Sequence, residues 1–361
     1  MTARLSLPGP SRRGVSLALA ALVSLALASC SGPTPAPGDG GDVRVVNVYT
    51  SRHYDADRTL YRLFEERTGI EVRVQEKRGE ELQALLEAEG EASPADLIVT
   101  VDAGNLYRLQ EAGLLAPVTS ETLTAAIPER YRDPEGRWYG FSRRARVIAF
   151  RTGVVSPDSV RSMEALASPA FRGRVCARSS TNPYNLSMLA SRIARQGPDA
   201  ALAWARGVAS NFARDPRGSD TDQLRAIAAG ECDVAIVNHY YLLRLQRSEA
   251  AADQATAAQV SILFPDQGEG QPGAHVNISG AGVAAHAPHP AEALALLEFL
   301  VSPEAQAALA ELNEEFPVSP GAPVPAELQA IGALREEETP LAALGQHQAQ
   351  AALIYEQAGW R

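Results

Sequence analysis

The chain has 361 residues, and its 33 basic and 43 acidic side chains give a net charge of −10. That length is sufficient for two lobes with separate cores. The negative charge disfavours binding to nucleic acid and to anionic membrane surfaces. We also expect the protein to be a monomer.

The N-terminus predicts export. Three arginines, Arg4, Arg12 and Arg13, precede an apolar run over residues 15–27 that is too short to cross a bilayer comfortably. The run ends in the sequence LASC, which resembles a bacterial lipobox. This resemblance implies a lipoprotein signal peptide over residues 1–29, lipid on Cys30 and a flexible tether over 30–42. The expected location is the cell envelope, lipid-anchored on a periplasmic or extracytoplasmic face. The alternative is an ordinary secretory signal with a chance cysteine.

Residues 43–113 alternate β-branched apolar segments with amphipathic ones. The pattern predicts strands over 43–49, 70–74 and 96–101, and helices over 57–68, 80–89 and 106–113. Gly69 and Gly113 end two of these helices. Strands that alternate with helices in this way predict a parallel sheet with right-handed crossovers.

A second set of alternating elements follows. We predict strands over 146–150, 174–177, 232–237 and 276–284, and helices over 185–196, 219–229, 240–246 and 291–312, the last interrupted at Ser302-Pro303. The two sets together predict an α/β protein with two lobes, in which each sheet is mixed but mostly parallel and is flanked by helices.

Tyrosines follow three of the predicted strands. His53 and Tyr54 come after the first strand, Tyr184 after the strand at 174–177, and Tyr240 and Tyr241 after the strand at 232–237. Open α/β sheets bind ligands at the carboxyl ends of their strands. A phenol keeps its proton until about pH 10, so several tyrosines at one point indicate a strong Lewis acid, and iron(III) suits hard anionic oxygen. Alone, each of these residues would more often be a core or loop aromatic.

Cys176 and Cys232 fall on predicted strands of one region, in a compartment that permits disulfides. A bridge between them and a pair of buried thiols are both open, because spacing does not establish connectivity. An enzyme that uses one of the two cysteines as a nucleophile is a third alternative.

Several stretches resemble the cyanobacterial-type ferric-iron-binding proteins of ABC importers, which have the type II periplasmic-binding-protein fold. The similarity covers essentially the whole mature chain. The stretches that carry it are YTSRHY at 49–54, SPAD at 93–96, GFSRRARVI at 140–148, GRV at 173–175, RSSTNPYN at 178–185, SNFAR at 210–214, YY at 240–241 and HVNISG at 275–280.

The resemblance implies a solute-binding protein rather than an enzyme, with an ABC permease and its ATPase as partners. It implies Fe³⁺ as the transported ligand, held by His53, Tyr54, Tyr184, Tyr240 and Tyr241. Arg144 and Arg244 are expected beside these ligands, where a guanidinium would offset the residual charge of four phenolates around Fe³⁺. Ser179 and Ser180 are candidates to hold a synergistic anion, and water or an arginine are the other candidates for the sixth iron position.

The same resemblance predicts the lobe boundaries. We expect an N-lobe of residues 43–141 plus 275–321, a C-lobe of residues 142–274 plus 322–361, and a hinge of crossing strands near 142–150 and 275–284. The competing hypothesis is a solute-binding protein for an organic or anionic small molecule, of the thiamine, polyamine or phosphonate type, in which the tyrosines stack on the solute.

Overall fold

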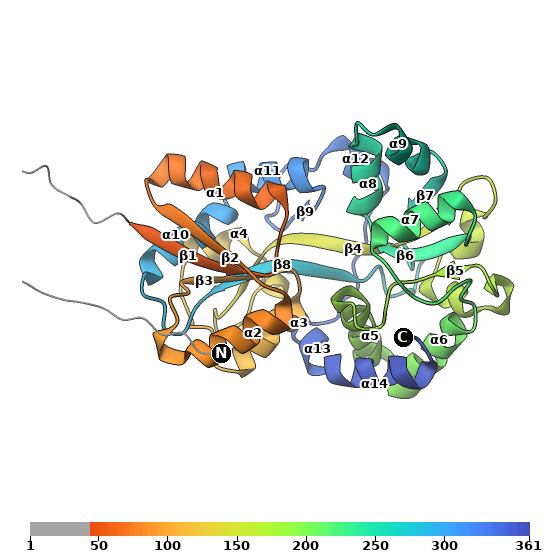
Figure 1. The fold of residues 1–361 in the computed structure, drawn as a ribbon, viewed down its shortest axis with the longest axis horizontal. Coiled ribbons are helices and arrows are strands. Elements are labelled where there is room, and N and C mark those ends of the chain that lie inside the picture. Colours follow the sequence, from red (N-terminus) through yellow and green to blue (C-terminus); the bar gives the residue numbers. More distant parts are fainter. Residues whose placement is uncertain (1–43) are drawn as a thin grey trace, which may run out of the picture. The chain divides into compact units, whose positions relative to one another are not determined.

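The computed structural model describes residues 44–361. The predicted signal peptide, Cys30 and the tether lie outside the described residues. Within them, one mixed sheet has the strand order β2-β1-β3-β8-β4-β6-β5, with β7 and β9 paired to β4 (Figure 1). The strands are β1 (Val45–Thr50), β2 (Glu71–Glu76), β3 (Leu97–Thr100), β4 (Tyr139–Arg151), β5 (Val175–Cys176), β6 (Val234–Asn238), β7 (Val260–Leu263), β8 (Val276–Val283) and β9 (Phe316–Pro317).

Strands β4 and β8 run from one lobe into the other and form the predicted hinge (Figure 1). Strand β8 pairs with β3 of the N-lobe, and the far half of β4 pairs with β6 of the C-lobe. Every antiparallel pairing of named strands in the described chain involves β4 or β8. The parallel pairings predicted from β-α-β order are confined to β2-β1-β3 and β5-β6, so the hinge makes the sheet less parallel than the sequence predicted.

The N-lobe core lies between its part of the sheet and six helices. Leu60 and Phe64 of α1 are almost fully buried, and Phe64 packs against Phe299 of α10 with ring centroids 5.6 Å apart. Gly69, with φ of 69°, ends α1 in the left-handed conformation that glycine adopts at low cost. The helices are α1 (Asp55–Thr68), α2 (Gly79–Glu89), α3 (Ala103–Glu111), α4 (Glu121–Ala126), α10 (Pro290–Leu300) and α11 (Pro303–Asn313).

The C-lobe has apolar clusters on both faces of its sheet. One cluster includes Trp204 and Trp360, and the other includes Leu224 and Leu242. The remaining helices are α5 (Pro183–Gln196), α6 (Pro198–Ala209), α7 (Asp220–Ala229), α8 (Tyr240–Arg247), α9 (Ala251–Ala257), α12 (Ala326–Ala330), α13 (Ala342–Gln346) and α14 (Gln348–Ala358).

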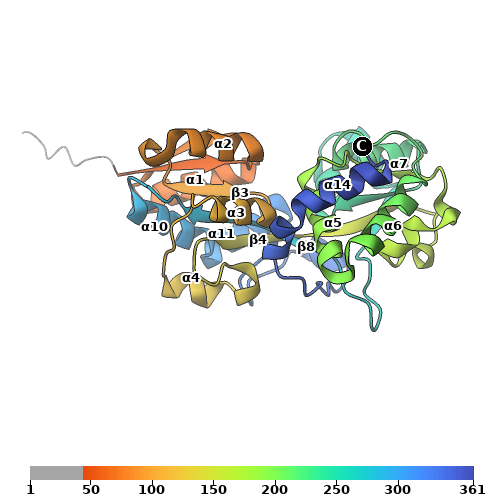
Figure 2. The same ribbon diagram turned by 90° about the horizontal axis from the view of Figure 1, so that it is seen from below.

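The C-terminal helices lie across the boundary between the lobes. Helix α14 packs against α5 and α6, whereas α13 packs against both α3 of the N-lobe and α5 of the C-lobe (Figure 2). Leu341 and Leu344 accordingly belong to the N-lobe core. No single helix within residues 44–361 is long and apolar enough to cross a membrane, although the bent pair α10–α11 meets that test by length and composition.

A disulfide joins Cys176, at the end of β5, to Cys232, two residues before β6. Their Cα atoms are 5.8 Å apart and the sulfurs 2.09 Å. The bridge ties two parallel neighbouring strands. Since both thiols are consumed, neither cysteine offers the thiolate that a nucleophilic mechanism would need.

Candidate metal centre

Tyrosines that follow three of the strands come together between the lobes. Tyr54 follows β1 and is the N-cap residue of α1, while Tyr184 lies in the first turn of α5 and Tyr240 begins α8 directly after β6. Helix α5 starts where it does because Pro183 occupies its first turn and the side chain of Asn182 accepts a hydrogen bond from the Tyr184 amide at 3.1 Å. The local starts of these helices therefore fix the directions of the tyrosines.

The tyrosine hydroxyls from both lobes meet. The Tyr54 hydroxyl lies 3.3 Å from that of Tyr184 and 3.3 Å from that of Tyr240. Tyr240 is fully buried, and its hydroxyl accepts a hydrogen bond from Asn238 Nδ2 at 3.1 Å. The ring of Tyr241 packs on that of Tyr240 with centroids 4.5 Å apart. The structure thus gathers all four tyrosines singled out in the sequence.

His53 lies outside this gathering. It is exposed, and it lines a cavity of about 270 Å³ in the N-lobe together with Tyr54, Asp57, Tyr61 and Glu76. Its ring centroid is 5.3 Å from that of Tyr54. The role of His53 as an iron ligand stays a prediction.

Burial makes these phenols hold their protons. The pKa of Tyr54, of Tyr240 and of Tyr241 is raised, first because burial disfavours the phenolate and then because the neighbouring tyrosines, Tyr184 foremost, would repel it. Among residues 44–361, no three His, Cys, Asp or Glu side chains cluster in a way that would hold a metal ion. The meeting point of the tyrosines therefore offers phenolic oxygen, which only a strong Lewis acid would deprotonate at neutral pH.

Arg144 and Arg244, which were predicted to lie beside the iron ligands, are close to the phenols. Arg144 is buried, its guanidinium lies 5.1 Å from the Tyr184 ring, and its Nε and Nη1 have no hydrogen-bond partner in the described structure. Arg244 lies 4.8 Å and 4.5 Å from the rings of Tyr54 and Tyr240. Arg144 Nη2 donates to the Val101 carbonyl and lies 3.9 Å from Asp102 Oδ2, so the guanidinium is only partly satisfied. A further negative charge nearby would stabilise it. Phenolates at this point would supply that charge.

Two further arginines were not singled out in the sequence. Arg52 is buried with its guanidinium 4.8 Å from the Tyr54 ring, and it forms ion pairs with Asp57 at 2.8 Å and Glu315 at 3.3 Å. Arg178 lies 5.6 Å from the Tyr184 ring and pairs with Asp220 at 3.6 Å. Both residues lie inside the stretches YTSRHY and RSSTNPYN, so their closeness to tyrosines in the chain was the available signal.

The two serines proposed for an anion are only partly buried. The Ser179 hydroxyl is engaged locally, since it accepts a hydrogen bond from the Thr181 amide at 3.3 Å and lies 3.0 Å from the Thr181 hydroxyl. An anion at Ser179 and Ser180 stays a prediction.

His239, next to Tyr240, was also missed by the sequence reading. Its Nδ1 accepts a hydrogen bond from the Ala145 amide at 3.2 Å, which leaves Nε2 to donate to the Glu314 carbonyl at 2.8 Å. Burial lowers the pKa of His239 to about 4, so the ring is neutral at pH 7. The residue ties the start of α8 to β4 and to the segment after α11.

Comparison with known proteins agrees with this architecture. Residues 59–336 match the family described as bacterial extracellular solute-binding protein. The chain belongs to this family. Among curated members, iron uptake protein A2 of Synechocystis sp. is 46% identical over 318 residues, which are 88% of this chain and 90% of that protein. The major ferric iron-binding protein of Neisseria meningitidis serogroup B is 26% identical over 94% of this chain and 98% of its own length.

Solved structures of solute-binding proteins have the same fold as this chain. The Trichodesmium protein FutA in complex with iron and citrate ligands is 44% identical, with a TM-score of 0.83 over 88% of this chain and 100% of that one. Apo FutA2 from Synechocystis is 46% identical, with a TM-score of 0.83 over 88% of this chain and 99% of that one. The two-lobed type II fold predicted for this family member is confirmed.

Proposed function

We propose that this protein is the iron(III)-binding component of an ABC importer. The observation that carries the proposal is the meeting of the hydroxyls of Tyr54, Tyr184 and Tyr240, from opposite lobes, within hydrogen-bond distance. Relatives at 46% and 44% identity over about nine-tenths of their lengths are named iron uptake proteins. An organic solute is not favoured, because the phenols are packed against one another at the point where a stacked solute would lie.

Capture of iron replaces protons by one cation. Tyr54, Tyr184, Tyr240 and Tyr241 would lose their protons to bind Fe³⁺, and the complex would carry one residual negative charge. Arg144 and Arg244 lie close enough to the rings to offset that charge. His53 is the proposed fifth ligand, and water, an anion or an arginine would complete the coordination.

Iron bridges the lobes and therefore favours the closed arrangement. An ion that contacts both lobes binds the closed form better than the open form, which shifts the population toward closure. Release at a membrane permease would follow opening, or reduction to Fe²⁺, which suits phenolate less well. Lipid on Cys30 would keep the protein near that permease and its ATPase. We propose this binding role in place of catalysis.

Ferric loading followed by desalting tests the proposal. Ferric phenolate absorbs visible light by charge transfer, so the expected result is a coloured protein with one iron per chain. A colourless protein without retained iron would overturn the proposal and return the organic solute as the leading hypothesis. A chain with Tyr184→Phe and Tyr240→Phe, carried through the same steps, controls for iron adsorbed elsewhere.

A further inference from the structure

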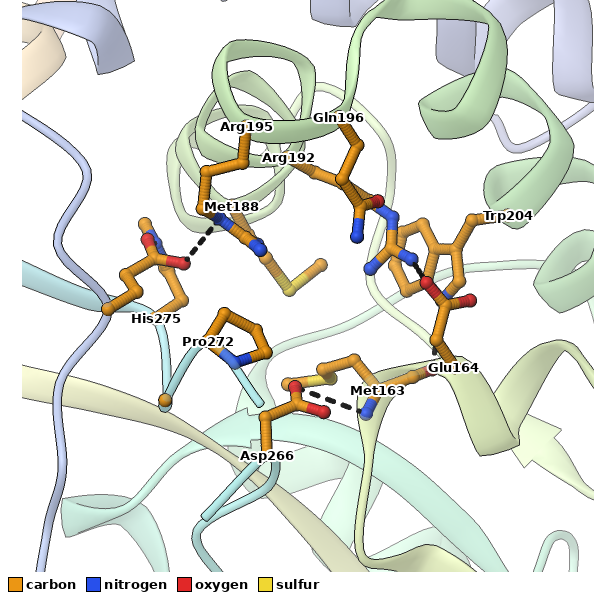
Figure 3. Close-up of a pocket in the computed structure, with 12 residues that line it drawn as sticks. Met163, Glu164, Met188, Arg192, Arg195, Gln196, Trp204, Asp266, Pro272 and His275 are labelled. Carbon is orange, nitrogen blue, oxygen red and sulfur yellow. Dashed lines mark hydrogen bonds and ion pairs between the residues drawn. The ribbon is translucent and has the colours of Figure 1, made fainter. Parts of the chain in front are cut away.

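A second cavity of about 60 Å³ lies in the C-lobe and shares no lining residue with the tyrosine cluster (Figure 3). We call it the α5 cavity, since α5 contributes Met188, Arg192, Arg195 and Gln196 to its wall. Trp204 of α6, the loop before β8, Met163, Glu164 and Glu337 also line it. Its volume is sufficient for a few water molecules or one very small organic ion.

Arg192 is the unusual residue of this cavity. It is 6% exposed, and its guanidinium stacks on Trp204 with 4.5 Å to the ring centroid. Its ion-pair partner is Glu164, whose side chain is 59% exposed (Figure 3). The Nε atom is buried and has no hydrogen-bond partner among the described residues. A buried cation held mainly by a solvated carboxylate is incompletely neutralised.

The other acidic groups of the α5 cavity offset the charge of Arg192 only in part, since attraction to Asp266 and Glu337 does not cancel the effect of burial on its pKa. The Glu337 carboxylate already has two partners: Oε1 lies 2.6 Å from His275 Nδ1, and Oε2 forms an ion pair with Arg195 Nε at 3.2 Å. Burial raises the pKa of Asp266, which favours its neutral form, and its carboxyl accepts a hydrogen bond from the Met163 amide at 3.4 Å. Burial, followed by repulsion from Arg195, lowers the pKa of Arg192 to about 10. An added negative charge would relieve both effects.

Part of the remaining wall is apolar. Met163, Met188, Trp204 and Pro272 line the cavity, and Met188 and Pro272 point toward its middle in Figure 3. Thioether and indole surfaces favour a hydrocarbon group over water. The site therefore combines one under-neutralised guanidinium with a small apolar surface.

We propose that the α5 cavity binds a small carboxylate monoanion of the size of formate or acetate. The carboxylate accepts hydrogen bonds from Arg192, and the hydrogen or methyl end contacts Met163, Met188 and Trp204. The guanidinium–carboxylate pairing supplies affinity, and the limited volume supplies selectivity against larger acids. The inference does not rest on iron capture, because the cavity shares no residue with the tyrosines.

The position of the site connects it to moving parts of the molecule. Met188 lies one turn after Tyr184 on α5, and His275 is the residue before β8. An occupant of the α5 cavity contacts the helix that presents Tyr184 and lies against the entrance of a strand that crosses between the lobes.

Tryptophan fluorescence of the iron-free protein tests the proposal. The three tryptophans are Trp138, Trp204 and Trp360, and Trp138→Phe leaves the two in the C-lobe, whose ring centroids are 6.1 Å apart. Sodium acetate or formate is exchanged for sodium chloride at constant ionic strength. A saturable change is expected. The absence of a saturable change, or a response to butyrate as strong as that to acetate, would overturn the proposal.

Variants of Arg192 decide whether the response comes from this site. Arg192→Gln is expected to weaken acetate binding at least about tenfold, and Arg192→Lys less, since hydrogen bonds to charged groups are worth about 1.5–3 kcal/mol. Arg206→Gln, on the exposed side of α6, is the matched control and keeps full affinity. Circular dichroism checks that each variant folds. If Arg192→Gln does not fold, the acetate affinity of the folded Arg192→Lys variant tests the site instead. An acetate affinity equal to that of wild type in either variant contradicts the assignment.

Discussion

At the scale of single residues, the candidate site depends on phenols that are kept apart from water and supported by arginines. Asn238 fixes the Tyr240 hydroxyl, and Arg52 holds the Tyr54 ring while Asp57 and Glu315 hold Arg52. Removal of a proposed ligand oxygen should therefore have a different effect from removal of a supporting group, because only the ligand oxygen would bond to iron.

Tyr240→Phe removes one ligand oxygen and leaves the ring that packs on Tyr241. We expect ferric affinity to fall at least about 100-fold, since loss of even an outer partner of a metal ligand commonly costs 10–100-fold. Competition with citrate, followed by the visible charge-transfer band, measures the change. Tyr139→Phe is the control, because the hydroxyl of this buried residue donates to the Val118 carbonyl in the N-lobe core. Equal losses in the two variants would indicate a general effect on folding.

Iron binding should release phenolic protons. The pKa of Tyr54, Tyr240 and Tyr241 is raised by burial and mutual repulsion, so these groups are protonated in the iron-free protein at pH 7. Affinity is therefore expected to fall as the pH is lowered. Loading with ferric citrate in a pH-stat should release about one proton fewer from Tyr240→Phe than from wild type. Identical proton release from both proteins would show that Tyr240 does not ionise on binding.

At the scale of elements, the hinge and the ligand-bearing helix are held together by His239. It contacts Ala145 on β4 and the carbonyl of Glu314, a residue with a left-handed φ of 51° in the turn after α11. Arg244 and Arg247 of α8 also pair with the Glu314 carboxylate. The start of α8, and with it Tyr240, is thereby fixed relative to β4 and to the turn after α11.

His239 predicts an acid-sensitive stability. Its pKa is about 4 in the folded protein against 6.5 ordinarily, so the unfolded chain binds the proton more tightly. The free energy of unfolding therefore has its full value above pH 6.5. It falls by about 3 kcal/mol as the pH decreases toward 4. Urea unfolding of the iron-free protein at several pH values measures this loss. His239→Gln, which lacks the titrating ring, should show a smaller dependence, and an unchanged dependence would contradict the assignment.

The disulfide contributes to stability at the same scale. Cys176 and Cys232 are separated by 56 residues, and a closed loop of that length restricts the unfolded chain by about 4 kcal/mol. The double variant Cys176→Ala/Cys232→Ala is expected to unfold at lower urea concentration with a similar slope. Wild type unfolded under reducing conditions should match the variant. If reduction leaves wild type unchanged, the bridge does not form in the protein.

At the scale of the whole described chain, two lobes share one sheet through β4 and β8, and the phenols meet where the lobes face each other. In the iron-free protein only neutral hydrogen bonds join the hydroxyls of the two lobes, and such bonds are individually weak in net terms. A trivalent cation adds an interaction that exists only when the lobes are closed. Closure and capture are therefore one event.

The sequence predicted the lobes and the gathering of tyrosines because strand ends in α/β sheets meet at one edge. It did not predict that His53 is exposed, since the periodicity of strands and helices does not set the exposure of a residue in the loop between them. Helix α14 was missed because its many alanines give little contrast between buried and exposed faces. The share of antiparallel pairing was underestimated because it arises from the strands that cross between lobes, and such pairings join residues far apart in the chain.

Resonance Raman spectroscopy of the iron-loaded protein, excited in the visible band, tests the central claim most directly. The account predicts tyrosinate vibrations in the wild type that lose intensity both in Tyr54→Phe, from the N-lobe, and in Tyr184→Phe, from the C-lobe. Iron that binds tightly without enhanced tyrosinate vibrations would contradict it, as would spectra that stay the same in both variants.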